Sequence, residues 1–148
     1  MKKLEYTIDI QSSQKEIWEK MLNKDTYVEW TNVSWPGSFY KGKWEKGEKL
    51  RFISEDGSGT LAQITELEPY RKIHADHIAI LEKGGIEDRE SDVAKGWIGT
   101  QETYIFTPKG NGTHLKVEML INPDWEKMFN DGWPNALAKL KEICERKN

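Results

Sequence analysis

The sequence predicts an α+β fold in which one curved antiparallel sheet wraps around a long C-terminal helix. Three observations lead to this prediction. Short segments of alternating apolar and polar residues follow one another between residues 39 and 121, which favours strands joined by turns. A helical period then runs from residue 122 almost to the C-terminus. One curved sheet cannot cover its own concave face, so we expect this helix to close it.

The composition indicates one globular domain with a heavily charged surface. The chain has 148 residues, of which 36% are hydrophobic and 32% are charged, and its formal net charge is −3. We therefore expect a single domain over residues 1–148. The acidic balance speaks against a nucleic-acid partner, and no apolar run is long enough to suggest a membrane span. One cysteine excludes a disulfide framework, and we expect a cytoplasmic protein.

The N-terminal segment is expected to form a strand and two short helices. Apolar and polar residues alternate over residues 4–10, which is typical of a half-buried strand. Ser13 and Glu16 form a capping-box pattern that starts the first helix. Asp25 is the expected N-cap of the second helix, which reaches Trp30.

Turn residues divide the middle of the chain into short strands, giving about six or seven in all. Pro36-Gly37 and the Asp-Gly-Ser-Gly segment at 56–59 are the clearest turn signals. The charged stretch 83–96 has no apolar period, and we interpret it as a long, mobile loop. The predicted strands are residues 39–44, 49–54, 60–68, 71–82, 97–107 and 115–121. In strand 71–82 one face is expected to hold Ile73, Ala75, His77, Ala79 and Leu81.

The C-terminal helix is expected to begin at Asn122-Pro123-Asp124, because proline is favoured in the first helical turn. Apolar residues recur at helical spacing beyond that point. Gly132 and Pro134 interrupt the pattern, so we expect a bend there that directs Trp133 into the core.

Five segments of the sequence carry a family resemblance. They are Ile8 to Trp18, then Trp30, then Gly59 to Pro69 with Arg71, then Phe106-Thr107-Pro108 with Gly112-Thr113-His114-Leu115, and finally Gly132-Trp133-Pro134 with Leu137, Leu140 and Lys141. In this order they resemble the START-like superfamily (SRPBCC), which has the helix-grip fold. The last segment is similar to the closing motif of the branch named for the activator of the ninety-kilodalton heat-shock chaperone ATPase. The chain departs from the family pattern in its single proline after Glu68 and in the charged insert at 83–96.

The resemblance implies an internal cavity that binds a hydrophobic or aromatic small molecule, and we expect no cofactor. A few relatives are cyclases, aromatases or hydrolytic proteins, so an enzyme that uses the same cavity is one alternative. A co-chaperone or interaction module is another. Chaperone activators of this family carry an additional N-terminal domain, whereas this sequence opens directly on a strand, so a chaperone partner is not expected. We expect a monomer or a weak homodimer.

Aromatic residues are unusually abundant, with seven Trp, five Tyr and four Phe. Small-molecule pockets are lined mainly by apolar and aromatic side chains, although the same residues could instead plug the cavity. The candidate cavity residues are Trp30, Trp35, Phe39, Trp44, Phe52, His77, Trp97, Glu102, Tyr104, Met119, Phe129 and Trp133.

Two titratable residues are expected on the inner face of the sheet. His77 follows the apolar alternation of its strand, and counting in twos from Tyr104 places Glu102 inward. A slip of one residue in register would instead expose Glu102. If both face inward, they form a polar spot in an apolar pocket. His77 is then a satisfied core residue, a ligand-orienting group or a general base, and we assign no catalytic residue.

The other residues that could carry chemistry are interpreted as structural. His74 and His114 fall on polar strand faces. The acidic residues within 88–92 lack the spacing of a calcium-binding loop. Cys144 lies on the apolar stripe of the C-terminal helix without a neighbouring base. We therefore expect neither a metal site nor a nucleophile.

Overall fold

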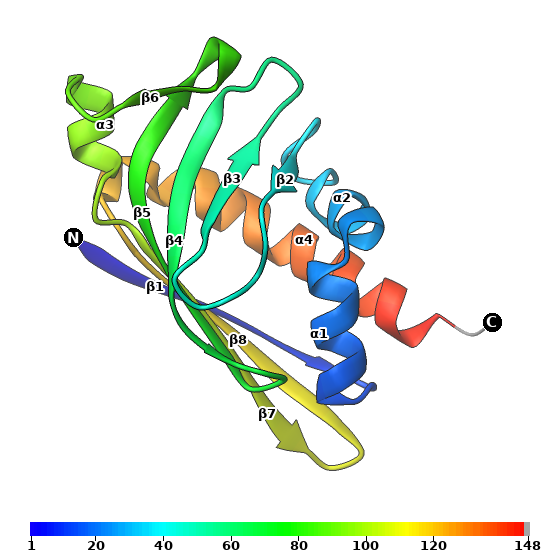
Figure 1. The fold of residues 1–148 in the computed structure, drawn as a ribbon. Coiled ribbons are helices and arrows are strands. Elements are labelled where there is room, and N and C mark those ends of the chain that lie inside the picture. The colour runs from blue at the N-terminus through cyan, green and yellow to red at the C-terminus, as the bar shows by residue number, and fades with distance from the viewer. Residues whose placement is uncertain (147–148) are drawn as a thin grey trace.

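The computed structural model describes residues 1–146 and contains one antiparallel sheet of eight strands. The helix α4 (Glu126–Glu145) lies behind the curved sheet along its concave side (Figure 1). The helices α1 (Gln14–Leu22) and α2 (Lys24–Thr31) lie near the C-terminal end of α4, and α3 (Asp92–Trp97) lies near its other end. This arrangement is the predicted helix-grip fold.

The strands follow one another in the sheet in the order β1-β8-β7-β5-β4-β3-β2. Strand β6 was not predicted from the sequence. It pairs with the C-terminal part of β5, beyond the residues of β5 that pair with β7. Strand β2 is also shorter than predicted. The bounds are β1 (Lys2–Ile10), β2 (Phe39–Lys41), β3 (Lys49–Ile53), β4 (Gly59–Glu68), β5 (Lys72–Glu82), β6 (Ile86–Asp88), β7 (Gln101–Lys109) and β8 (Gly112–Ile121).

Side-chain caps fix where the first two helices begin. The backbone N–H of Glu16 donates to the hydroxyl of Ser13 over 3.1 Å, as the capping-box pattern predicted. The second cap is Asn23 and not Asp25, because the Asn23 side chain accepts from the Asp25 N–H over 3.0 Å. Asn23 also ends α1, since its own N–H donates to the carbonyl of Glu19. One extended residue thus separates two helices that the sequence pattern had spaced further apart.

The prediction of a loop over residues 83–96 was wrong. A short 3-10 turn at Lys83–Gly85 leads into β6, and Ser91 caps α3 by accepting from the N–H of Ala94. Only Ala94 in this range is buried. The segment therefore lacks the repeating apolar residues from which a helix is predicted. Trp97 consequently closes α3 instead of opening a strand, and β7 begins at Gln101.

A bulge in β5 changes which residues face the main core. The pairing with β4 shifts by one residue between His77 and Ala79, which leaves Ile78 as an extra residue. Ala79 and Leu81 therefore belong to a second hydrophobic cluster instead of sharing the face of His77 as predicted. A periodic pattern cannot reveal such a shift, because burial continues to alternate on both sides of the bulge.

Helix α4 carries the aromatic centre of the main core. The helix continues without a break through Pro134, and the bend expected there stays a prediction. Trp133 is 3% exposed, as the helical pattern predicted. Its ring centroid lies 5.4 to 6.3 Å from those of Tyr6, Trp30, Trp35 and Tyr104. This one side chain therefore contacts β1, α2, the segment after α2 and β7.

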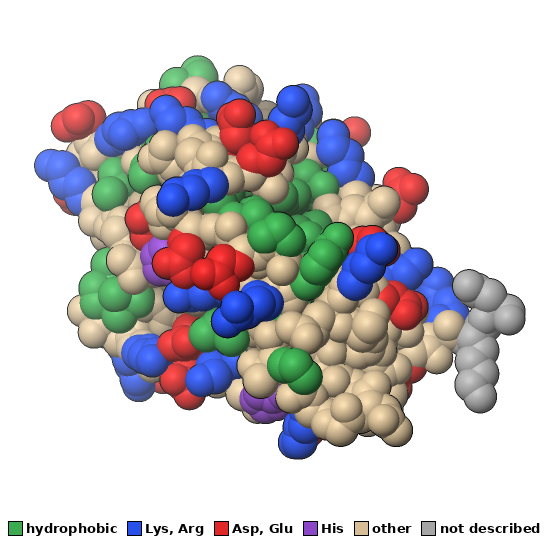
Figure 2. Space-filling view, turned by 60° about the horizontal axis from the view of Figure 1, so that its bottom comes forward, with side chains coloured by type: hydrophobic (Ala, Val, Ile, Leu, Met, Phe, Trp, Pro, Cys, Tyr) green, Lys and Arg blue, Asp and Glu red, His purple; other side chains and the backbone are tan. Residues whose placement is uncertain are grey.

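The surface mixes charges of both signs. Figure 2 shows acidic and basic side chains interspersed over one face, with small groups of hydrophobic side chains between them. Within residues 1–146, no helix is both long and apolar enough to cross a membrane.

Truncation of Trp133 tests its central place in the core. We expect Trp133→Ala to lower the free energy of unfolding by ~3–5 kcal/mol, because it empties a site surrounded by four other rings. Asn135→Ala, at an exposed position of the same helix, should change it by less than ~0.5 kcal/mol. Denaturant unfolding measures both, and a loss below ~1 kcal/mol for Trp133→Ala would show that its packing is dispensable.

Hydrogen exchange tests the stability of the insert. No residue from Lys83 to Ser91 is buried, and Ile86 is 66% exposed. Few buried contacts oppose local opening there, so we expect the amides of β6 to exchange well before those of β8. The amides of α3 should lie between the two, because Ala94 and Trp97 anchor it. Equal protection of β6 and β8 would contradict this expectation.

Candidate functional site: an aromatic cavity

A cavity of about 230 Å³ lies between the sheet and α4. Helix α2 and the segment after it form one wall, the strands β3, β4, β5 and β7 form the second, and α3 and α4 complete the lining. The lining residues are Tyr27, Trp30, Thr31, Trp35, Ser38, Phe52, Thr60, His77, Trp97, Glu102, Tyr104, Met128, Phe129 and Trp133.

Most of the candidate residues from the sequence line this cavity, namely Trp30, Trp35, Phe52, His77, Trp97, Glu102, Tyr104, Phe129 and Trp133. Three others do not. Tyr40 is the buried residue of β2, so its neighbour Phe39 faces the other way and joins the second hydrophobic cluster. Trp44 packs behind Phe52, with ring centroids 5.8 Å apart. Met119 is fully buried in the main core, next to β1, where side chains fill the space.

The sequence reasoning missed five lining residues, which are Tyr27, Thr31, Ser38, Thr60 and Met128. The position of Thr60 could have been predicted, because Thr60 lies on the same face of β4 as the buried Ala62 and Ile64. Tyr27 precedes Trp30 by almost one helical turn, which also placed it on the same face. Met128 belonged to the apolar period of the C-terminal helix, which was a signal for it. Ser38 carried none, since a polar residue at a cavity edge resembles any surface residue.

A hydrogen-bonded group of three side chains forms the polar part of the cavity. Nε2 of His77 lies 2.7 Å from one carboxylate oxygen of Glu102, and the hydroxyl of Tyr104 donates to the other over 2.5 Å. Antiparallel pairing places Glu102 opposite Ala75, so His77 is its diagonal neighbour on the same face. The inward position of both residues agrees with the alternation of their strands.

The charge state of this group follows from its contacts. Burial opposes ionisation of Glu102, but the charge of His77 and the hydrogen bonds from His77 and Tyr104 outweigh it, so the pKa of Glu102 is lowered. Burial and the neighbouring Glu102 raise the pKa of Tyr104 well above its usual value. At neutral pH, Glu102 is therefore a carboxylate that accepts two hydrogen bonds, and Tyr104 is a neutral donor.

Three buried nitrogen atoms of cavity residues have no hydrogen-bond partner within the described chain. They are Nδ1 of His77, Nε1 of Trp97 and Nε1 of Trp133. Most buried polar atoms in proteins are paired, and an unpaired one costs roughly 1–3 kcal/mol. All three atoms belong to residues that line the cavity.

The cavity edge lies between α4 and the segment that follows α2. Met128, on α4, is 39% exposed, and Trp35 faces it from the other side. The indole of Trp35 approaches α4 at Gly132, where a Cβ atom would lie 2.6 Å from the ring. The glycine therefore makes room for one of the rings that border the cavity.

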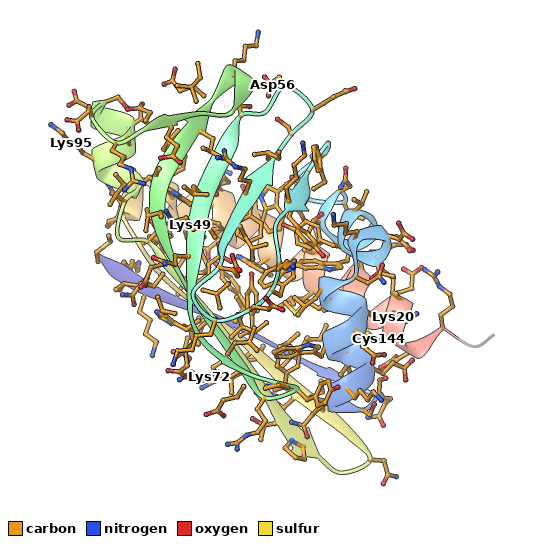
Figure 3. All side chains as sticks on the ribbon, in the orientation of Figure 1. Lys20, Lys49, Asp56, Lys72, Lys95 and Cys144 are labelled. Atoms are coloured by element: carbon orange, nitrogen blue, oxygen red, sulfur yellow. The ribbon has the colours of Figure 1, made fainter. Side chains whose placement is uncertain are left out.

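The remaining candidates for chemistry lie outside the cavity lining. His74 lies on the outer side, within hydrogen-bond distance of Thr103 and Asp76, and His114 contacts Asp9 over 2.6 Å. Cys144 is buried on α4 close to α1 (Figure 3), and burial raises the pKa of its thiol to about 12. Among residues 1–146, no three His, Cys, Asp or Glu side chains are grouped as metal ligands would be.

Comparisons with known proteins agree with the observed fold. The profile of the family described as "Activator of Hsp90 ATPase homolog 1-like protein" matches residues 11–145. No curated protein matches the chain significantly. Among solved structures, the Aha1 dimer from Colwellia psychrerythraea is similar at 20% identity and a TM-score of 0.73, over 98% of this chain and 97% of that one. A protein from Mesorhizobium loti is similar at 16% identity and a TM-score of 0.73, over 99% of both chains. CalU16 from Micromonospora echinospora is similar at 15% identity and a TM-score of 0.67, over 97% of this chain and 76% of that one.

Acid titration tests the Glu102 hydrogen bonds. The pKa of Glu102 is lower in the folded chain than its ordinary value of 4.5, so its ionised form stabilises the fold above that pH. This stabilisation is lost as the pH falls through the folded-state pKa. We expect the unfolding free energy of the wild type to drop more steeply below about pH 4.5 than that of Glu102→Gln. Exposed Glu19→Gln should keep the wild-type slope, and a Glu102→Gln slope equal to it would refute this account.

Proposed function

The chain belongs to the family of activator of Hsp90 ATPase homolog 1-like proteins, and we propose that it binds a small aromatic molecule in the cavity between its sheet and α4. The observation that carries the proposal is a cavity with aromatic walls, three of whose lining residues carry a buried, unpaired ring nitrogen. Sites for small molecules combine these two features, because the apolar wall supplies affinity and the few polar atoms fix orientation.

The size of the cavity limits the ligand. A cavity of about 150 Å³ holds benzene, and sites for drug-sized molecules begin at about 300 Å³. At about 230 Å³, this cavity fits one substituted ring or a fused pair of rings. Aromatic rings pack favourably against one another in edge-on or offset-stacked geometry. The rings of Trp97, Phe129 and Trp133 line the cavity and are available for such contacts with a ligand ring.

The cavity also supports an alternative in which it catalyses a reaction of the cyclase or hydrolase type. The observation in its favour is the His77–Glu102 pair, because a carboxylate that fixes one imidazole nitrogen prepares the other for proton transfer. Under the binding hypothesis, His77→Ala and Glu102→Gln weaken ligand affinity without abolishing any reaction. Under the enzyme hypothesis, the same changes remove turnover while binding persists.

Assembly, location and domain extent complete the proposal. A monomer or weak homodimer is proposed, and the fold is compatible with a dimer because the similar Colwellia protein is one. A cytoplasmic location and a single domain over residues 1–148 are proposed on the grounds given by the sequence. Stoichiometric retention of a chaperone in a pull-down would favour the co-chaperone alternative.

Native mass spectrometry of the protein purified from its own source tests the binding function. We expect a retained molecule with the mass of a one-ring or two-ring compound, released on denaturation. Binding of naphthalene, followed by quenching of the cavity tryptophans, supplies a second measurement that does not depend on the natural ligand.

A pair of variants on β4 provides the matched control. Thr60 lines the cavity, whereas Thr65 on the same strand is exposed. Thr60→Phe should fill the cavity and weaken naphthalene binding by on the order of tenfold or more, and Thr65→Phe should leave it unchanged. A wild-type protein that retains no molecule and does not bind naphthalene would overturn the proposed function.

A further inference from the structure

We propose that the ligand carries an aromatic hydroxyl group that pairs with Nδ1 of His77, and that His77 thereby selects weakly acidic hydroxyaromatic molecules. This inference rests on the proposed function, because it assigns the class of molecule that the same cavity binds. It identifies His77 as a specificity-determining residue and does not require that the protein catalyse a reaction.

The contacts of His77 leave only Nδ1 for a ligand. Its Nε2 is occupied by Glu102 over 2.7 Å, and the second oxygen of Glu102 is occupied by the hydroxyl of Tyr104. The two bonds hold the imidazole in one orientation. His77 is only 2% exposed, so its Nδ1 is also shielded from water. No group of the described chain forms a hydrogen bond with Nδ1.

A hydroxyaromatic group satisfies Nδ1 in either protonation state of the imidazole. When Nε2 carries the only ring proton, Nδ1 is an acceptor and the ligand hydroxyl donates to it. When the ring is an imidazolium, Nδ1–H donates to the phenolate form of the same ligand. The two arrangements differ only in the position of one proton, so the pair remains hydrogen-bonded and no atom is gained or lost. A carbonyl or an ether is suitable only for the second arrangement.

The charges of the cavity discriminate against strongly acidic ligands. Glu102 is its only acidic lining residue among those described, and none of the described lining residues is Lys or Arg. Lysine side chains such as Lys72 and Lys95 lie on the outside of the molecule (Figure 3). A carboxylate ligand would therefore add a second negative charge beside Glu102, and the His77 imidazolium, which is already paired with Glu102, would be the one cation among the described lining residues. A phenol enters as a neutral molecule, because its pKa is close to that of tyrosine, about 10.

The surroundings of His77 suit a ring that carries this hydroxyl. The imidazole centroid lies 5.0 Å from that of Trp97, at an interplanar angle of 74°, and 6.2 Å from that of Phe52. A ligand hydroxyl at Nδ1 thus brings its ring against aromatic walls, where edge-on and offset contacts are favourable.

Four probes of matched shape test the inference on the wild-type protein, namely 2-naphthol, 2-methoxynaphthalene, naphthalene and 2-naphthoate. Their dissociation constants are measured by tryptophan quenching and calorimetry. We expect 2-naphthol to bind on the order of tenfold more tightly than naphthalene or 2-methoxynaphthalene, because only it pairs with Nδ1 in both protonation states. We expect 2-naphthoate to bind most weakly.

The outcomes separate this inference from the proposed function. If none of the four probes binds and the purified protein retains no molecule, the proposed function fails and this inference fails with it. If naphthalene binds as tightly as 2-naphthol, the cavity binds aromatic molecules but the inference about the hydroxyl is wrong. Equal binding of 2-methoxynaphthalene and 2-naphthol, or preferential binding of 2-naphthoate, would also overturn the inference.

Variants assign the preference to His77. In His77→Phe the ratio of naphthalene to 2-naphthol dissociation constants should fall to about one, whereas His74→Phe, on the same strand but outside the cavity lining, should keep the wild-type ratio. Nitrogen NMR on the histidine-labelled wild type gives a measurement that does not depend on the folding of a variant. The Nδ1 resonance of His77 should shift on addition of 2-naphthol and not of naphthalene, and an unchanged resonance would refute the contact.

Discussion

The packing of Trp133 between the sheet and α4 is the contact on which the rest of the architecture depends. Rings from β1, α2, the segment after α2 and β7 all approach this one indole, so the position of α4 across the sheet is fixed by aromatic contacts at its middle. Gly132 belongs to the same arrangement, because its missing side chain lets Trp35 lie against the helix. Since Trp30, Trp35 and Trp133 also line the cavity, the residues that hold the fold together form part of its functional wall.

The cavity combines a strongly apolar lining with a small polar group that is only partly satisfied. Ionised Glu102 is tolerated at depth because His77 and Tyr104 both hydrogen-bond to it, which offsets the loss of water around the charge. The same arrangement leaves Nδ1 of His77 without a partner, together with two indole N–H groups. A core optimised only for stability would pair or remove these atoms. Local departures of this kind are expected where a protein holds a ligand.

The segment between β5 and β7 shapes the cavity more than its composition suggests. Strand β5 pairs with β7 only as far as Asp76, and β6 becomes its partner from Ile80 onward. The chain between these two pairings forms α3, whose last residue, Trp97, packs edge-on against His77. The charged insert therefore delivers an aromatic wall residue beside the polar group. The exposed part of the insert, residues 83–91, contributes no buried residue, whereas its end at α3 contributes the buried Trp97 to the cavity wall.

The sequence alone determined which face several key residues take within their own elements. Alternation placed His77 and Glu102 inward, the helical period placed Trp133 in the core, and Ser13 marked the start of α1, because each of these depends on local periodicity or local hydrogen bonding. Only the tertiary structure decided where inward-facing side chains leave space. It placed Met119 in a filled core and Trp97 at the cavity, and it introduced the bulge at Ile78, because these outcomes depend on how far α4 stands from each strand and on where neighbouring strands separate. The physical reason is that periodicity reports direction along one element, whereas a cavity is a distance between several elements.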